Sequence, residues 1–161
     1  MTELPLEIER KFLIAMPPSS LLEILPHSTI TQTYLLGDAN EEKRVRRIED
    51  GNGVRYVKTV KSSVSKLTRV ERENRISEEE YAALLKEADP SRRPLSKTRY
   101  FLSCGDLYFE IDVYPFWRDQ AVMEVELPSE DTPISFPPEL MILREITGDP
   151  QYKNSNLAKL K

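Results

Sequence analysis

Polar and apolar residues alternate along much of this chain, and the alternation is clearest near its start. In the segment 4–14, which we predict to be a strand, Glu7, Glu9 and Lys11 share one face, and mostly apolar residues share the other. Neighbours on one face of a strand are about 6.5–7 Å apart. Two carboxylates and an ammonium in a row suit a divalent cation beside a polyanion. They also fit a solvated sheet face, so the choice between these two interpretations depends on the pattern of the later strands.

Seven further segments show the strand pattern, with turn residues between them. We predict strands at 29–36, 43–48, 54–61, 69–74, 95–103, 107–114 and 121–127. The stretch Asp50-Gly51-Asn52-Gly53 is typical of a tight hairpin turn. Ser77 followed by Glu80 predicts a capping box at the start of a helix that ends near Asp89-Pro90. We also predict a short helix at 19–25, an irregular segment at 128–138 and a weakly helical segment at 152–161.

The polar faces of these later strands repeat the charges of the first. They carry Arg44 and Arg46, Lys61, Arg69 with Glu71 and Glu73, Lys97 with Arg99, Glu110 with Asp112, and Glu124 with Glu126. About eight strands are enough to close a sheet around a small cavity. A charged interior is too costly to bury dry, so it implies water, metal ions and a highly charged ligand. We therefore predict an α+β, mainly β fold: an eight-stranded antiparallel closed β-barrel, or tunnel, with helices packed outside.

Composition restricts the possible functions. A chain of 161 residues with 31% charged and 39% hydrophobic residues suits a single globular domain, 1–161. The net charge of −4 argues against nucleic-acid binding through bulk positive charge. No apolar run is long enough to span a membrane. The early acidic residues do not resemble a signal peptide, so we expect a cytoplasmic protein.

The scarcity of cysteine and histidine restricts the chemistry further. Cys104 is the single cysteine and His27 the single histidine. This excludes an internal disulfide and a zinc site made of cysteine and histidine. Metal chemistry in this chain must use carboxylates, which points to Mg²⁺ or Mn²⁺.

The charged motifs, taken in order, resemble those of the CYTH superfamily, the triphosphate tunnel metalloenzymes. Glu7-x-Glu9-x-Lys11 is similar to the ExExK signature of that family. Arg44-x-Arg46, Thr59-Val60-Lys61, Arg69-x-Glu71-x-Glu73, Lys97-x-Arg99, Glu110-Ile111-Asp112 and Glu124-Val125-Glu126 resemble its later motifs, and the stretch 152–158 resembles its usual tail. ExExK alone is a weak pattern, but seven matches in order over nearly the whole chain are specific.

This resemblance implies an eight-stranded tunnel and a metal-dependent reaction on a triphosphate. We expect hydrolysis of inorganic triphosphate, with Lys11, Glu7 and Glu9 as catalytic residues. Lys11 would contact the phosphate chain or orient the attacking water. The expected phosphate-binding residues are Lys11, Arg44, Arg46, Lys61, Arg69, Lys97 and Arg99. The expected ligands of Mg²⁺ or Mn²⁺ are Glu7, Glu9, Glu71, Glu73, Glu110, Asp112, Glu124 and Glu126.

Several alternatives stay open at this point. The family also contains adenylate cyclases that make cyclic AMP and thiamine triphosphatases, and Trp117 could serve as a platform for thiamine. A non-catalytic polyphosphate-binding module is a rival of another class. Glu110 and Asp112 could also serve only to balance charge and hold the arginines. We expect a small-molecule triphosphate as partner, with no nucleic acid and no membrane, and a homodimer is left open.

Overall fold

The computed structural model describes residues 6–38, 40–63 and 68–159, and of Leu6, Glu7 and Arg69 only the backbone. The strands are β1 Leu6–Ala15, β2 His27–Tyr34, β3 Glu41–Asp50, β4 Gly53–Ser63, β5 Thr68–Ile76, β6 Leu95–Cys104, β7 Leu107–Val113, β8 Gln120–Glu126 and β9 Ile142–Glu145. The α-helices are α1 Ser19–Leu22, α2 Glu78–Leu84 and α3 Asn154–Leu157, and the 3₁₀ turns are η1 Leu85–Glu87 and η2 Pro150–Tyr152. No helix in these ranges is long and apolar enough to cross a membrane.

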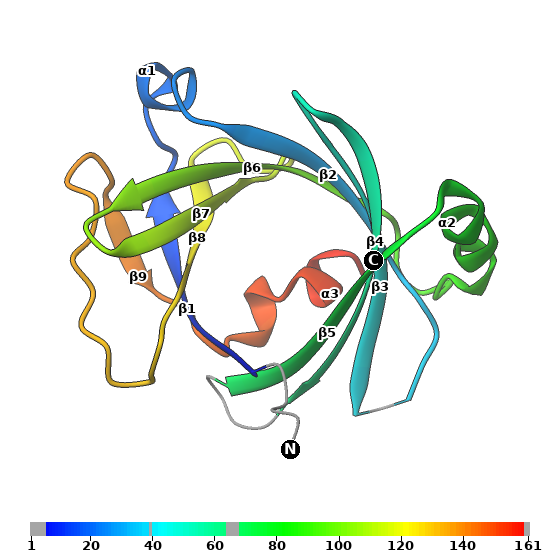
Figure 1. Ribbon diagram of the computed structural model, residues 1–161. Helices are drawn as coiled ribbons and strands as arrows, with labels where there is room; N and C mark the ends of the chain where they lie inside the picture. The colour runs from blue at the N-terminus through cyan, green and yellow to red at the C-terminus, as the bar shows by residue number, and fades with distance from the viewer. Residues whose placement is uncertain (1–5, 39, 64–67, 160–161) are drawn as a thin grey trace.

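The strands form one antiparallel sheet in the order β5-β4-β3-β2-β6-β7-β8-β1-β9, with a further pairing between β5 and β1. The sheet curls round so that its two ends approach each other (Figure 1). Within the described ranges the β1–β5 pairing covers Leu6↔Val70, Glu7↔Arg69 and Ile8↔Thr68. Further along, the same edge of β1 pairs with β9 instead.

The predicted eight-stranded closed barrel is therefore wrong in two respects. In the part of the chain that the structure describes, the sheet has nine strands, and β1 and β5 do not pair along their length to close it. The physical reason is that one edge of β1 pairs with β8, so a single edge is left for β5 and β9. Beyond Ile8 that edge is occupied by β9 and by the segment after it, where the Ile146 N–H donates to the Lys11 carbonyl at 2.8 Å.

The helices occupy two different places. Helix α2 lies outside the curl, as predicted, whereas α3 lies within it (Figure 1). The prediction that the helices pack outside is therefore wrong for the C-terminal segment. Its apolar residues explain the position, because Ala158 and the preceding Ile146 pack with Leu13, Tyr114 and Val122 in one buried cluster. Burying these side chains anchors the tail inside the sheet.

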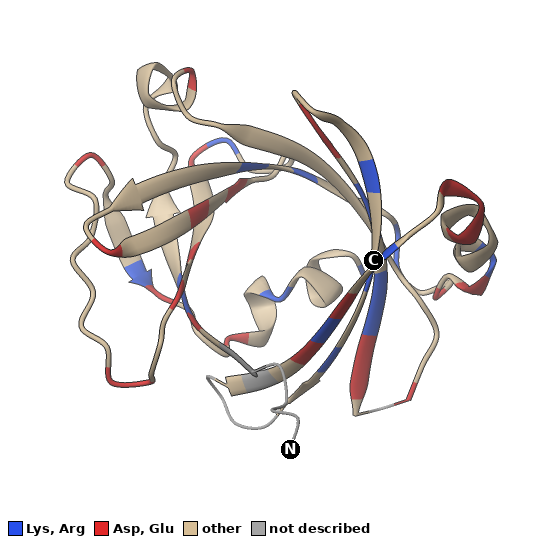
Figure 2. Ribbon diagram, viewed as in Figure 1, with Lys and Arg blue, Asp and Glu red and all other residues tan. Residues whose placement is uncertain are grey.

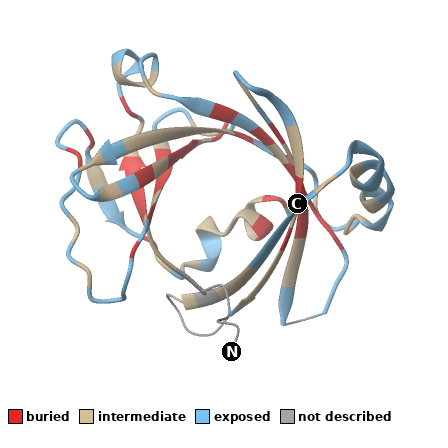
Figure 3. Ribbon diagram, viewed as in Figure 1, coloured by how far each residue is buried: buried red, intermediate tan, exposed pale blue. Residues whose placement is uncertain are grey.

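The larger core lies on the outer face of β1, β7 and β8. Phe12, Ile14, Phe109, Met123 and Val125 belong to one cluster, and each is at most 4% exposed. Ile134 and Leu140, from the segment after β8, cover it. Buried positions occur on these strands and also on β2 and β3, whereas α2 is largely exposed (Figure 3). Because strands alternate, a buried outer face leaves the charged inner face of the same strands to line the interior.

Two local predictions are confirmed and one element was missed. Asp50 pairs with Gly53 across the predicted hairpin turn, where Gly53 has a φ of 120°. The Ser77 hydroxyl and the Glu80 carboxylate form the predicted capping box of α2. Strand β9 has only four residues. So short a strand shows no clear alternation, and its pairing with β1 comes from the tertiary fold.

Candidate active site

Charged side chains from β1 and from β3 to β8 surround one cavity of about 510 Å³. Ten predicted site residues line it: Glu9, Arg44, Arg46, Lys61, Glu71, Glu73, Arg99, Glu110, Glu124 and Glu126. Acidic and basic positions lie side by side on β3 and β5 (Figure 2). Since these residues occupy every second position of their strands, the curl of the sheet brings them together. The fold therefore brings to one cavity charged residues that are spread over 118 positions of sequence, counted from residue 9 to residue 126.

Two arginines on β3 are buried without enough acceptors. Arg44 and Arg46 are 6% and 5% exposed, and the Nε of each has no hydrogen-bond partner among the described residues. A terminal nitrogen of Arg46 donates to Glu73 at 3.0 Å. Burial, together with Arg44 and Arg99, lowers the pKa of Arg46 to about 9. An anionic ligand in the cavity would supply both the missing acceptors and the missing negative charge.

Lys97, Arg99 and Asp112 form a buried ion-pair cluster in the wall. Arg99 donates to Asp112 through Nε at 2.7 Å and Nη2 at 2.9 Å, and Lys97 Nζ lies 2.9 Å from the same carboxylate. Burial lowers the pKa of Lys97 to about 7 in spite of Asp112. For Asp112 burial acts upward, but the two cations hold its pKa well below its usual range.

Within this cluster only Arg99 lines the cavity, and Lys97 and Asp112 do not. Substrate binding by Lys97 and metal binding by Asp112 therefore stay predictions. The contacts of Asp112 favour the alternative in which it holds Arg99 in place. Arg99 also contacts Glu110 at 2.7 Å, which leaves the guanidinium fixed between two carboxylates at the cavity wall.

Lys11 lines a second, smaller cavity of about 50 Å³ that Glu9, Arg44 and Glu124 also line. Its Nζ donates to the Tyr152 carbonyl at 3.0 Å and lies 3.6 Å from Glu124. Burial raises the pKa of Glu124, but Lys11 and Arg99 outweigh it and lower that pKa to about 2. Glu124 is therefore ionised at neutral pH and available to a cation.

The lining has more carboxylates than positive side chains. The carboxylates are Glu9, Glu71, Glu73, Asp106, Glu110, Glu124 and Glu126, and the cations are Arg44, Arg46, Lys61 and Arg99. Glu110 faces Glu124 across the β7–β8 pair. Burial, with Glu124 and Asp112 nearby, raises the pKa of Glu110 against the pull of Arg99. Additional positive charge would relieve this excess.

A divalent metal ion fits this donor set, although no three carboxylates among the described side chains form a ready-made metal cluster. Mg²⁺ usually takes one or two protein carboxylates and completes its shell with water and substrate phosphates. The pairs Glu110–Glu124 and Glu9–Glu126, which face each other across adjacent strands, offer such ligands. The arrangement therefore suits a divalent cation whose remaining ligands come from water and from an anionic ligand.

Two predicted site residues fall outside the described side chains. Glu7 and Arg69 are cross-strand partners in the backbone pairing of β1 with β5. Their expected roles as a metal ligand and a phosphate ligand stay predictions. The ExExK assignment depends in part on Glu7 and therefore also stays a prediction.

Sequence reasoning missed several residues that line the smaller cavity: Tyr34, Glu42, Thr147, Lys153 and Asn154. Tyr34 is 3% exposed, and burial raises its pKa to about 12. The resemblance of the stretch 152–158 to the family tail was the one signal for Lys153 and Asn154. Trp117, by contrast, packs against Tyr114 and Tyr152 and lines neither cavity, so these contacts do not support it as a platform for thiamine.

The curled sheet and its lining define a protein that binds a compact polyanion in a charged interior. No family model matches the chain. An inorganic triphosphatase of Nitrosomonas europaea is 37% identical over 156 residues, which is 94% of this chain and 96% of the relative. An inorganic triphosphatase of Acetivibrio thermocellus is 31% identical over 154 residues, 95% of this chain and 93% of the relative.

Comparison with solved structures also finds an inorganic triphosphatase. The crystal structure of an inorganic triphosphatase matches with a TM-score of 0.59 and 32% identity over 98% of this chain and 95% of that one. A Pyrococcus horikoshii protein matches with a TM-score of 0.61 over 78% of this chain and 80% of that one, but at 17% identity, which shows the fold alone. The chain belongs to the family of these inorganic triphosphatases, the triphosphate tunnel family that its motifs resemble.

Proposed function

We propose that the protein hydrolyses inorganic triphosphate with the help of Mg²⁺ or Mn²⁺ bound in the charged cavity. The observation that carries the proposal is the pair Arg44 and Arg46, which are buried in a cavity rich in carboxylates. The Nε atom of each has no hydrogen-bond partner in the described part of the chain. Phosphate oxygens accept from guanidinium groups, and metal ions neutralise the carboxylates. A triphosphate with its metal satisfies both groups at once. The naming of two relatives as inorganic triphosphatases supports this choice of substrate.

The basic and the acidic side chains of the cavity have different roles. Arg44, Arg46, Lys61 and Arg99 hold the phosphate oxygens and stabilise the charge on the transferring phosphoryl group. Glu9, Glu124, Glu126 and Glu110 would hold the metal, with Glu7, Glu71 and Glu73 as further expected ligands. A bound metal ion polarises phosphate oxygens and lowers the pKa of bound water.

Lys11 lines the smaller cavity, which shares Glu9, Arg44 and Glu124 with the larger one. Its ammonium lies beside Glu124 and holds the carbonyl of Tyr152, so it can turn toward a phosphate oxygen or an attacking water by exchanging one acceptor for another. Positioning by fixed charges accounts for catalysis of this kind without a side-chain nucleophile.

The direct test is phosphate release by the purified chain from inorganic triphosphate, ATP and thiamine triphosphate, with Mg²⁺, with Mn²⁺ and with a chelator. A parallel assay measures cyclic AMP. We expect release of one phosphate from inorganic triphosphate as the fastest reaction, and its loss with the chelator. Dominant cyclic AMP formation would contradict the proposal. Tight triphosphate binding without any turnover would favour a binding module instead.

A matched pair of variants links this activity to the cavity. Glu124→Gln removes a carboxylate from the lining and should abolish metal-dependent release. Glu139→Gln makes the same change at an exposed position in the segment after β8, and should leave the activity unchanged. Equal activity of the two variants would refute the assigned site.

A further inference from the structure

Lys11 is held at three points by the segment that follows β9. Its backbone N–H donates to the Thr147 hydroxyl at 2.9 Å, and its carbonyl accepts from the Ile146 N–H at 2.8 Å. Its ammonium donates to the Tyr152 carbonyl at 3.0 Å. The segment therefore contacts the main chain and the side chain of Lys11, although the two lie near opposite ends of the sequence.

The Tyr152 carbonyl is the nearer of the two partners found for this ammonium within the described residues. The other partner, Glu124, lies 3.6 Å away, which is too far for a normal hydrogen bond. Glu124 is also one of the proposed metal ligands, so its charge does not serve Lys11 alone. An ammonium on a flexible chain takes its direction from its acceptors. The place of one backbone carbonyl therefore determines where Lys11 points.

That carbonyl belongs to η2, a short 3₁₀ turn. Gly148, with a φ of 74°, reverses the chain just before the turn, a conformation that glycine adopts without strain. The Asp149 carboxylate accepts from the Gln151 N–H at 3.0 Å and caps the turn. Because η2 has three residues, it makes few hydrogen bonds of its own. Its orientation therefore depends on contacts with the rest of the molecule.

Arg144 supplies such contacts from β9, at the edge of the sheet where the chain turns into the curl (Figure 1). Its Nη2 donates to the Tyr152 hydroxyl at 2.8 Å, and its Cζ lies 5.2 Å from the centre of the Tyr152 ring. Its Nη1 lies 3.7 Å from the Asp149 carboxylate. One planar guanidinium thus contacts the capping residue and the last residue of η2, which favours a single orientation of the turn.

Neither Arg144 nor Tyr152 lines the smaller or the larger cavity. The side chain of Arg144 is 52% exposed, and contacts of so exposed a group add little to stability. Any effect of these two side chains on the reaction must therefore pass through η2 and Lys11.

We propose that Arg144 and the side chain of Tyr152 are positioning residues, which fix the Tyr152 carbonyl and thereby the ammonium of Lys11. This inference rests on the proposed function, in which Lys11 meets a phosphate oxygen or the attacking water. The arginines of the wall hold most of the triphosphate charge. A displaced Lys11 therefore lowers the rate of the reaction more than the affinity for the substrate.

The test measures kcat and KM for inorganic triphosphate with Mg²⁺ in the wild-type chain and three variants. Tyr152→Phe removes the hydroxyl that Arg144 holds and keeps the ring, and Arg144→Gln removes the guanidinium. Each should lower kcat about tenfold and leave KM unchanged, since a misplacement of about 1 Å can cost up to about 100-fold.

The matched control is Arg55→Gln. Arg55 is also a partly exposed arginine, 3.1 Å from the carboxylate of Asp50, and it lines neither the smaller nor the larger cavity. Its replacement removes an ion pair of similar exposure at the far hairpin. It should leave both kcat and KM unchanged.

A second measurement follows Lys11 itself. The ¹⁵Nζ resonance of Lys11, assigned by its absence from the spectrum of Lys11→Arg, reports the surroundings of the ammonium. It should shift in Tyr152→Phe and in Arg144→Gln, because the acceptor moves, and keep its place in Arg55→Gln. This measurement needs no substrate and no turnover.

Failure of this inference and failure of the proposed function give different results. A lower kcat with unchanged KM and a shifted Lys11 resonance supports the inference. An unchanged kcat, an effect mainly on KM, or a lower kcat without the shift overturns it, while triphosphate hydrolysis stands. If the wild-type chain does not hydrolyse inorganic triphosphate, the proposed function fails. The Lys11 resonance then decides the positioning: a shift in both variants supports it, and no shift refutes it.

Discussion

Asp112→Asn tests the buried cluster that holds Arg99 at the cavity wall. Asp112 is 1% exposed and is the shared partner of Lys97 and Arg99. Asparagine has nearly the same shape, so the change removes a charge without leaving a cavity. Two buried cations then lose the carboxylate between them.

The expected loss follows from the contacts. Removing one partner of a buried ion pair costs about 3–5 kcal/mol, because the remaining charge stays buried without compensation. We expect the free energy of unfolding to fall by that amount at pH 6. This is a large share of the roughly 5–15 kcal/mol that stabilises a domain of this kind.

The pH dependence of the loss gives a sharper test. Burial holds the pKa of Lys97 at about 7, below its ordinary value of 10.5, so the folded state binds fewer protons than the unfolded state between these values. Wild-type stability from this group therefore rises with pH above 7. Without the Asp112 charge the pKa of Lys97 falls further, and in the variant the rise begins at lower pH. The difference between wild type and variant should shrink as pH increases toward 7, by up to about 1.4 kcal/mol per unit, and then stay constant.

Urea unfolding followed by circular dichroism at pH 6, 7 and 8 measures this difference. Glu110→Gln is the control, because Glu110 contacts the same Arg99 at 2.7 Å but its side chain is 35% exposed. We expect its effect to stay below about 1 kcal/mol, as for other solvated pairs. A loss below about 1 kcal/mol for Asp112→Asn, or a loss that grows with pH, would refute the account of the cluster.

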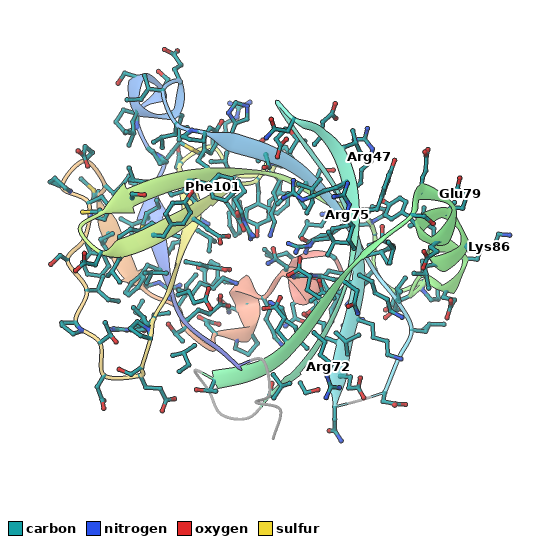
Figure 4. The ribbon with its side chains drawn as sticks, in the orientation of Figure 1. Arg47, Arg72, Arg75, Glu79, Lys86 and Phe101 are labelled. Atoms are coloured by element: carbon teal, nitrogen blue, oxygen red, sulfur yellow. The ribbon has the colours of Figure 1, made fainter. Side chains whose placement is uncertain are left out.

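Three further predictions concern the site and the scaffold. Glu9→Gln should abolish metal-dependent phosphate release while the urea midpoint stays near that of the wild type; near-normal turnover in a phosphate assay would count against its role. Arg46→Ala should weaken triphosphate binding by about 1.5–3 kcal/mol, the usual contribution of a charge-assisted contact, in calorimetric titrations. Its neighbour Arg47 points outward, near α2 (Figure 4), and Arg47→Ala should leave that affinity unchanged. Ser77→Ala removes the capping box of α2 and should lower the free energy of unfolding by about 1 kcal/mol without changing kcat; a fall in kcat would show that α2 affects the site.

The sequence predicted strands β1 to β8 and the ten charged residues that line the larger cavity, because both depend on local periodicity. The inner face of the sheet carries Glu9, Arg44, Arg99 and Glu124, because each of them belongs to a run of charged residues at every second position of its strand. The capping box at Ser77 and the hairpin ending at Gly53 are also local, since each is complete within four residues. The sequence could therefore place these features without knowledge of the rest of the chain.

The tertiary structure alone decided how the sheet ends and which charges reach the cavity. Strand β9 and the tail compete with β5 for one edge of β1, and no local pattern reveals which partner an edge takes. Lys97 and Arg99 follow the same alternation, yet Lys97 is buried against Asp112 while Arg99 reaches the cavity. That distinction depends on the curvature of the wall and on the depth of each side chain within it, which are properties of all the strands together.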